Sequence, residues 1–206
     1  MKKILFIIFI LLLGLNTPAF SQDTSTINGS SHLNKGEYDS LEVNGSLTFT
    51  DLAIKDSIVI NGSIQGKNLK CETMESNGSV DINGLKAQSV ESNGSFSGEN
   101  IDIMGELEVN GRLEIKNGKL HNIKIASTSS TIIDTQVNGN IRIEKATGGW
   151  KFFGFKSNES SPQILELKGN SIVIGDVIFE KEGEVHLFDI AKVEGKVINA
   201  KVIQKK

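Results

Sequence analysis

The 206-residue chain has few of the residue types that build large-ring cores, disulfides and metal sites. Aromatic residues make up 6% of it, and proline occurs only twice. It has three histidines, His32, His121 and His186, and a single cysteine, Cys71. This set cannot supply a structural zinc site of the Cys/His type, and one cysteine cannot form a disulfide within the chain. We therefore expect no metal and no cofactor.

No excess of positive charge is present either. Lysine and arginine total 22 against 25 aspartates and glutamates, a formal net charge of −3. Nucleic-acid binding requires a concentrated basic face, which this balance does not favour. Glycine, in contrast, is abundant at 21 residues, which is typical of a chain with many tight turns.

The first 21 residues have the pattern of a bacterial export signal. Lys2 and Lys3 precede an apolar run from Ile4 to Leu15, and small residues follow at Ala19 and Ser21. We predict cleavage after Ser21. The apolar run is shorter than the roughly 20 residues that span a bilayer, so no transmembrane anchor is expected after cleavage. The mature chain is therefore expected in the periplasm, on the cell surface or in the medium.

A repeat occupies most of the remaining chain. Asn–Gly pairs begin at residues 28, 44, 61, 77, 93 and 110, at intervals of 16 or 17 residues. Apolar residues keep the same interval, in pairs two positions apart, with a new pair every five or six residues. A spacing of two places both side chains on one face of a strand, and each break predicts a corner. Three short strands and three corners then close one turn of 16–17 residues.

The pattern therefore predicts an all-β fold, a single-stranded parallel β-solenoid with three sides. Equivalent residues of successive coils would stack in columns about 4.8 Å apart. One coil cannot bury its own apolar face, so the stacking supplies the core. Cys71 falls in an apolar column with Ile54, Ala87 and Ile103, and we expect a buried thiol there.

The Asn–Gly pairs are expected at one corner of each coil. Glycine tolerates a left-handed conformation at a sharp corner, and stacked asparagines can bond to one another as a ladder. The corner ladder is assigned to Asn44–Gly45, Asn61–Gly62, Asn77–Gly78, Asn93–Gly94 and Asn110–Gly111. Five pairs also match the Asn-x-Ser acceptor for glycosylation, but an acceptor site would not require glycine each time.

The repeat predicts five segments within one domain. Residues 1–21 are the signal peptide, 22–39 a lead-in, 40–145 solenoid coils, 146–163 an insertion, and 164–206 further coils. The insertion holds an unusual density of rings, at Trp150, Phe152, Phe153 and Phe155. These rings either fold back over the solenoid or form an exposed contact for a partner.

The closing pattern Val173-Ile174-Gly175-Asp176-Val177-Ile178-Phe179-Glu180, with Val193-Glu194-Gly195-Lys196-Val197 after it, resembles the bactofilin, or polymer-forming, β-helix group. The glycine-marked repeats from Leu41 to Ile115 look similar, and the resemblance covers residues 40–145 and 164–203. It implies a compact, right-handed, three-sided β-helix that polymerises end to end. Two departures from the group are the export signal, since bactofilins are typically cytoplasmic scaffolds, and the aromatic insertion.

The chain shows no arrangement typical of an enzyme. Carboxylates such as Asp81, Glu91 and Glu108 alternate with apolar residues, which is what a solvated outer face produces. The three histidines are expected at the surface, and no Ser/His/Asp set can be placed. The leading hypothesis is an exported, non-enzymatic scaffold that assembles with itself. The alternative is a secreted binding module or adhesin that recognises a glycan or an envelope protein through a solenoid face or the aromatic insertion.

Overall fold

The computed structural model describes residues 24–145 and 162–206. The expected signal peptide and the four rings of the insertion lie outside these residues. The described residues form strands and no helix, and none of them forms a helix that could span a membrane. Its strands are β1 (Thr24–Tyr38), β2 (Ser40–Ile54), β3 (Ser57–Lys70), β4 (Thr73–Ser76), β5 (Ser79–Ala87), β6 (Ser89–Ser92), β7 (Ser95–Val109), β8 (Leu113–Ile125), β9 (Ser129–Ile133), β10 (Gln136–Val137), β11 (Ile141–Ile143), β12 (Gln163–Lys168), β13 (Ile172–Val173), β14 (Val177–Leu187), β15 (Lys192–Val193) and β16 (Val197–Gln204).

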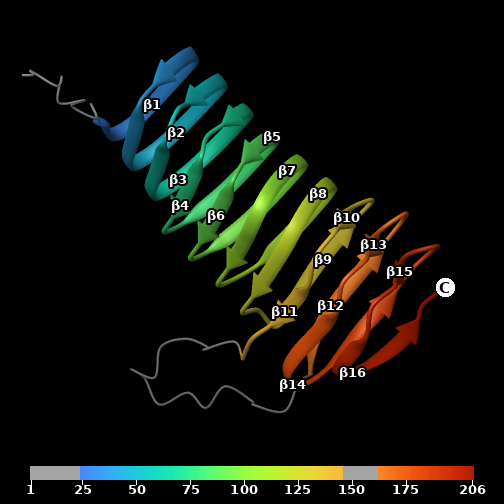
Figure 1. Ribbon diagram of the computed structural model, residues 1–206. Coiled ribbons are helices and arrows are strands. Elements are labelled where there is room, and N and C mark those ends of the chain that lie inside the picture. The colour runs from blue at the N-terminus through green and yellow to red at the C-terminus, as the bar shows by residue number, and fades with distance from the viewer. Residues whose placement is uncertain (1–23, 146–161) are drawn as a thin grey trace, which may run out of the picture.

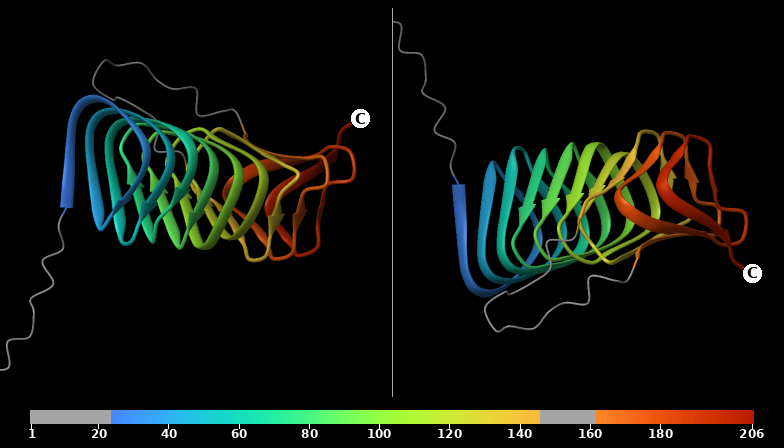
Figure 2. Two further views of the ribbon diagram at one scale, coloured as in Figure 1. Left: turned by 90° about the horizontal axis from the view of Figure 1, so that it is seen from above. Right: turned by 90° about the horizontal axis from the view of Figure 1, so that it is seen from below.

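The strands stack as a parallel β-solenoid of about ten turns, as the repeat predicts. The coils follow one another along a single axis from β1 to β16 (Figure 1), and the views from above and below show the same order of turns (Figure 2). Each coil pairs with the next one in parallel register, 16 or 17 residues further along the chain in the first six coils. The stack as a whole is the domain.

The first coil begins earlier than the sequence repeat led us to expect. Residues 22–39 were expected as a lead-in, but β1 forms a complete coil that pairs with β2 from Thr24 to Tyr38. The Asn–Gly pair at Asn28 belongs to this coil and aligns with the pair at Asn44. The lead-in assignment was therefore wrong. The apolar pattern of residues 24–38 is weaker because they form an end coil, which packs against another coil on one side only. At the insertion, β12 begins at Gln163, one residue before the expected boundary.

The core consists of the apolar columns. Ile82 is 1% exposed whereas its neighbour Asp81 faces solvent, so the predicted alternation of sides is confirmed. Large and small residues also alternate along a column. Gly66 lies against the ring of Phe49, and a Cβ at residue 66 would overlap that ring. Ile82 and Gly98 continue this column in the next two coils. Large and small residues in adjacent coils thus fill the interior together.

In the first six coils, coil length varies only at the corner between residues 38 and 41 and its equivalents, which we call the third corner. From Ile54 to Ile58 and from Ile103 to Leu107 the chain uses one residue more than the equivalent stretches of the neighbouring coils. In the second case the extra residue produces a register shift, and Met104 there is 54% exposed. The third corner of the coil therefore absorbs the difference between 16 and 17 residues, and the other two corners keep their register.

One column contains buried serines. Ser76 and Ser92 are fully buried between Ile60 and Val109, and neither hydroxyl has a hydrogen-bond partner. An unpaired buried hydroxyl destabilises a folded protein by about 1–3 kcal/mol.

We expect Ser92→Val to stabilise the protein by about 1 kcal/mol, because it removes an unpaired hydroxyl and adds apolar contacts in a column that elsewhere holds valine and isoleucine. Denaturant unfolding measures the change. The matched control is Ser97→Val on the outer face, which should change stability by less than about 0.5 kcal/mol. A less stable Ser92→Val variant would show that the column has no room for two methyl groups.

Candidate functional site

The most regular polar feature of the surface is the asparagine ladder at the first corner. The amide nitrogen of each asparagine donates to the side-chain oxygen of the asparagine one coil earlier. The five bonds run from Asn44 to Asn28 (3.3 Å), Asn61 to Asn44 (3.0 Å), Asn77 to Asn61 (3.1 Å), Asn93 to Asn77 (3.2 Å) and Asn110 to Asn93 (2.9 Å). The ladder has a direction, because every amide nitrogen points towards the N-terminal end of the stack.

The glycines beside the ladder are needed for close stacking. At Gly78 an added Cβ would overlap the carbonyl oxygen of Gly62, and at Gly94 it would overlap that of Gly78. Gly45, Gly62 and Gly111 have φ angles of 146–157°, whereas Gly78 and Gly94 are not among the positive-φ glycines. The expectation of a left-handed glycine at every Asn–Gly corner was therefore wrong. The stacking contact between coils is the constraint that all of these corners share.

The left-handed residues form a separate column, at a second corner seven residues after each ladder asparagine. In the first six coils the residues at this corner are Lys35, Asp51, Asn68, Gly84, Asn100 and Asn117, and all have φ between 53° and 88°. Asparagine, aspartate and glycine tolerate this conformation best. Two Asn–Gly pairs outside the main interval, at residues 83 and 117, lie at this corner. They are the sequence feature from which the left-handed corner could have been predicted.

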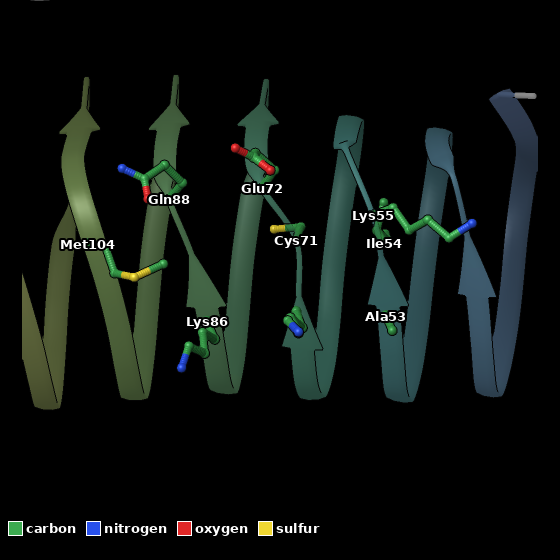
Figure 3. A pocket seen from close by; sticks show the side chains of 9 residues that line it. Ala53, Ile54, Lys55, Cys71, Glu72, Lys86, Gln88 and Met104 are labelled. Atoms are coloured by element: carbon green, nitrogen blue, oxygen red, sulfur yellow. The ribbon is translucent and has the colours of Figure 1, made fainter. Parts of the chain in front are cut away.

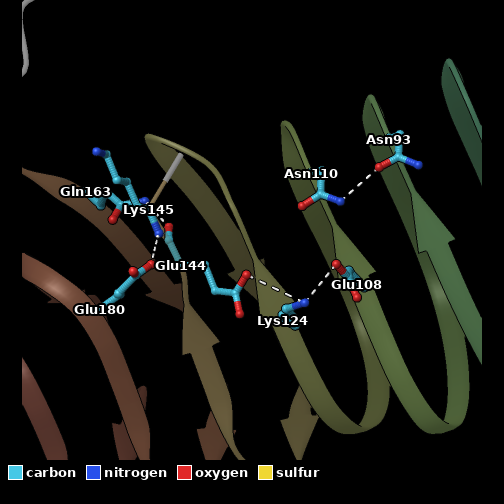
Figure 4. Close-up of polar contacts among 8 residues, drawn as sticks. All are labelled: Asn93, Glu108, Asn110, Lys124, Glu144, Lys145, Gln163 and Glu180. Atoms are coloured by element: carbon cyan, nitrogen blue, oxygen red, sulfur yellow. Dashed lines mark hydrogen bonds and ion pairs between the residues drawn. The ribbon is translucent and has the colours of Figure 1, made fainter. Parts of the chain in front are cut away.

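The ladder ends at Asn110, two coils before Glu144. Ala126 and Glu144 take the ladder position in the next two coils, because their backbone nitrogens donate to Val109 and Ile125 as the asparagine nitrogens do to the coil before them. Figure 4 shows Asn110 as the last ladder member, with Lys124 between Glu108 and Glu144. The hydrogen bond that Lys124 donates to Glu108 raises the pKa of Lys124. The described chain thus reaches Lys145 at the ladder corner, two coils after the last stacked glycine of the ladder.

Both ends of the insertion are fixed to the solenoid wall. On the entry side, the Lys145 backbone nitrogen donates to Glu180 (2.7 Å). On the exit side, the Gln163 side-chain nitrogen donates to the carbonyl oxygens of Ser127 (2.7 Å) and Glu144 (2.8 Å). Gln163 is buried, and its side-chain oxygen has no partner. The expected partner contacts Trp150, Phe152, Phe153 and Phe155 lie outside the described residues.

A shallow hollow of about 420 Å³ opens at the third corner around the cysteine (Figure 3). Its lining comes from four successive coils and includes Lys55, Lys86 and Met104. Cys71 is 7% exposed, as expected for its column, and burial raises the pKa of its thiol to about 12. The thiol is therefore protonated near neutral pH and is a poor nucleophile.

The remaining candidate groups lie apart from one another. His32 and His121 face solvent, but His186 is 8% exposed, so the expectation that all three lie at the surface was wrong for it. Its Nε2 lies 2.7 Å from the Glu184 carboxylate, and Glu166 and Ile203 of the adjacent coils cover it on both sides. In residues 24–145 and 162–206 no three His, Cys, Asp or Glu side chains converge as a metal site.

The candidate acids follow the outward columns. Glu75, Glu91 and Glu108 stack in register, one per coil, and the Glu108 carboxylate pairs with Lys124 (3.0 Å). Asp81 accepts a hydrogen bond from Gln65. Such rows arise wherever equivalent outer positions stack.

No family model, curated protein or solved structure matches this chain. What can be concluded about its function therefore rests on its own geometry.

We expect Gly78→Val to cost about 1–3 kcal/mol of stability, because the new side chain must displace the backbone of the preceding coil. Ser79→Ala, at the adjacent exposed position, should cost less than about 0.5 kcal/mol. Thermal melts of the two variants make the comparison. Equal melting temperatures would mean that the coils at this corner are further apart than the contacts indicate.

The direction of the ladder predicts that aspartate lowers stability more at a position whose amide donates to the previous coil than at the first position, which only accepts. In Asn61→Asp a carboxylate replaces the amide that donates to Asn44, so a hydrogen bond is lost and two oxygens face each other; the cost should be about 1 kcal/mol at neutral pH. In Asn28→Asp the carboxylate still accepts from Asn44, and stability should change by less than about 0.5 kcal/mol.

The pH dependence checks the cause of the Asn61→Asp effect. Repulsion from the facing oxygen disfavours the charged form in the folded state, so the folded pKa of Asp at 61 should be raised above the unfolded value of about 3.9. The difference from the parent should therefore be largest near neutral pH and shrink as the pH falls below about 4. Equal penalties for both aspartate variants would contradict the direction of the ladder.

Proposed function

We propose that this protein is an exported structural rod that assembles head to tail through its two end coils. The feature that carries the proposal is the contrast between the ends. The last coil, residues 188–206, contains five lysines and two carboxylates, whereas the first coil, residues 24–39, contains one lysine and two carboxylates. A basic end and an acidic end attract each other, while two copies of the same end repel.

Both ends also present open strand edges. Within the described chain, β1 pairs only with β2, and β16 pairs only with β14. The free backbone groups of such an edge are a template for another strand. Joining β16 of one copy to β1 of the next would continue the parallel arrangement found between all neighbouring coils, and it would need no new type of contact.

Apolar residues at the C-terminal end remain partly uncovered. Val202 aligns with Val185 of the previous coil, which is fully buried, yet Val202 is 51% exposed because no coil of the described chain stacks on its other side. Three of the six inner positions of the first coil hold apolar side chains, Ile27, Leu33 and Tyr38, and all three are only partly buried. Ser25, Ser31 and Gly36 occupy the other three. Covering the apolar residues of both ends in a joint between copies would extend the core of one rod into the next.

Two sequence features support the same proposal. The export signal at residues 1–21 supports a rod outside the cytoplasm, and the resemblance to the bactofilin group supports end-to-end polymerisation. The outer columns hold carboxylates and lysines in rows rather than in a converging group, and we assign the protein no catalytic role.

Sizing and electron microscopy of the mature chain test the proposal. We expect species whose size grows with protein concentration and which dissociate at high salt, because the joint joins opposite charges. Val202→Lys should weaken association roughly tenfold or more by placing an unpaired charge in the joint.

The matched control is Met104→Lys, an exposed apolar residue in the middle of the rod, which should leave association unchanged. A chain that stays monomeric at all concentrations and binds a glycan or an envelope protein would overturn the scaffold proposal in favour of a binding module. Association that Met104→Lys weakens as much as Val202→Lys would rule out an end-to-end joint.

A further inference from the structure

The six ladder asparagines all precede glycine, the sequence context in which asparagine deamidates most readily. In this reaction the glycine backbone nitrogen loses its proton and attacks the asparagine Cγ. The new N–Cγ bond closes a succinimide ring, and the side-chain amide nitrogen leaves as ammonia. Water then opens the ring to aspartate or isoaspartate. Glycine permits the attack because it has no side chain to block it.

The ladder restrains the side chain that must move. Ring closure requires the asparagine Cγ to rotate towards its own backbone. In the interior of the ladder this rotation breaks the bond that the amide donates and the bond that the oxygen accepts, as at Asn61, which bonds to Asn44 and Asn77. Each bond lost raises the barrier to attack.

The glycine column restrains the backbone that must move. Gly62 and Gly78 each lie so close to the glycine carbonyl of the preceding coil that no Cβ would fit between them. Ring closure changes the backbone geometry at the glycine nitrogen, and the tight contact opposes this change. This restraint is independent of the side-chain bonds.

Asn28–Gly29 keeps only one of the two side-chain bonds and lacks the backbone restraint. In the described part of the chain no coil precedes β1, so the Asn28 amide nitrogen has no ladder acceptor and Asn28 only accepts from Asn44. A Cβ added at Gly29 would meet no atom within 4 Å. We propose that the ladder shields its five later Asn–Gly pairs from deamidation and leaves Asn28 as the first of the six ladder asparagines to be modified in the folded chain.

The position of this site limits the damage. Aspartate at residue 28 can still accept the bond from Asn44, whereas aspartate further along would lose a donor. Isoaspartate adds a methylene to the backbone, which at residue 28 would shift only an end coil. The direction of the ladder thus places the reactive pair where its product disturbs the stack least.

Peptide mapping by mass spectrometry after incubation at mildly alkaline pH tests the proposal. In the folded chain, Asn28 should gain the one-dalton increment of deamidation at least about tenfold faster than Asn61, Asn77 or Asn93, the effect expected from one or two hydrogen bonds. In the chain unfolded by denaturant, the rates should become similar. Equal rates in the folded chain, or protection of Asn28, would overturn the proposal.

A second variant separates shielding by the ladder from general stability. Asn61→Ala removes the acceptor of Asn77, so Asn77 should deamidate faster, whereas Asn110 keeps its bond to Asn93 and should not change. Equal acceleration at both residues would indicate global opening and refute the ladder's role. Parallel measurements on Val202→Lys keep this test separate from the proposed assembly, which would cover Asn28 in the parent chain.

Discussion

Every part of this structure depends on register between coils. Because one coil stacks on the next at about 4.8 Å, each residue faces its own counterpart from the previous turn, and a single position is repeated along the whole rod. The residue type at one position of a coil must therefore be compatible with the equivalent residues of the neighbouring coils. This is why whole columns are apolar, small or hydrogen-bonded. The stack also explains why the core exists at all, since no single coil could bury its inner side.

The fold could be predicted because stacking imposes its interval on the sequence. The spacing of Asn–Gly pairs and of apolar pairs fixed the coil length, and the alternation around Asp81 and Ile82 fixed which side faces inward. The conformation of the glycines was not predictable in this way. A repeated glycine indicates either a left-handed backbone or a close contact, and the repeat alone does not distinguish them.

Features that depend on a single coil were the hardest to anticipate. Ser76 and Ser92 are polar residues in an apolar column, and sequence gives no reason to bury them. His186 appeared outward from its alternation, yet neighbouring coils cover it. The first coil was taken for a lead-in because an end coil buries less and shows a weaker pattern. The left-handed corner, in contrast, had a usable signal in the asparagines, aspartate and glycine seven residues after five of the six ladder asparagines.

The three corners of the coil differ in how freely the chain can be lengthened. The glycine corner is closed by backbone contact, and the second corner is held by left-handed residues, but the third corner already admits an extra residue at Met104 and again between Ile54 and Ile58. An engineer who wished to display peptides at regular intervals along this rod would graft them there. Within the first six coils the other two corners keep the register between turns.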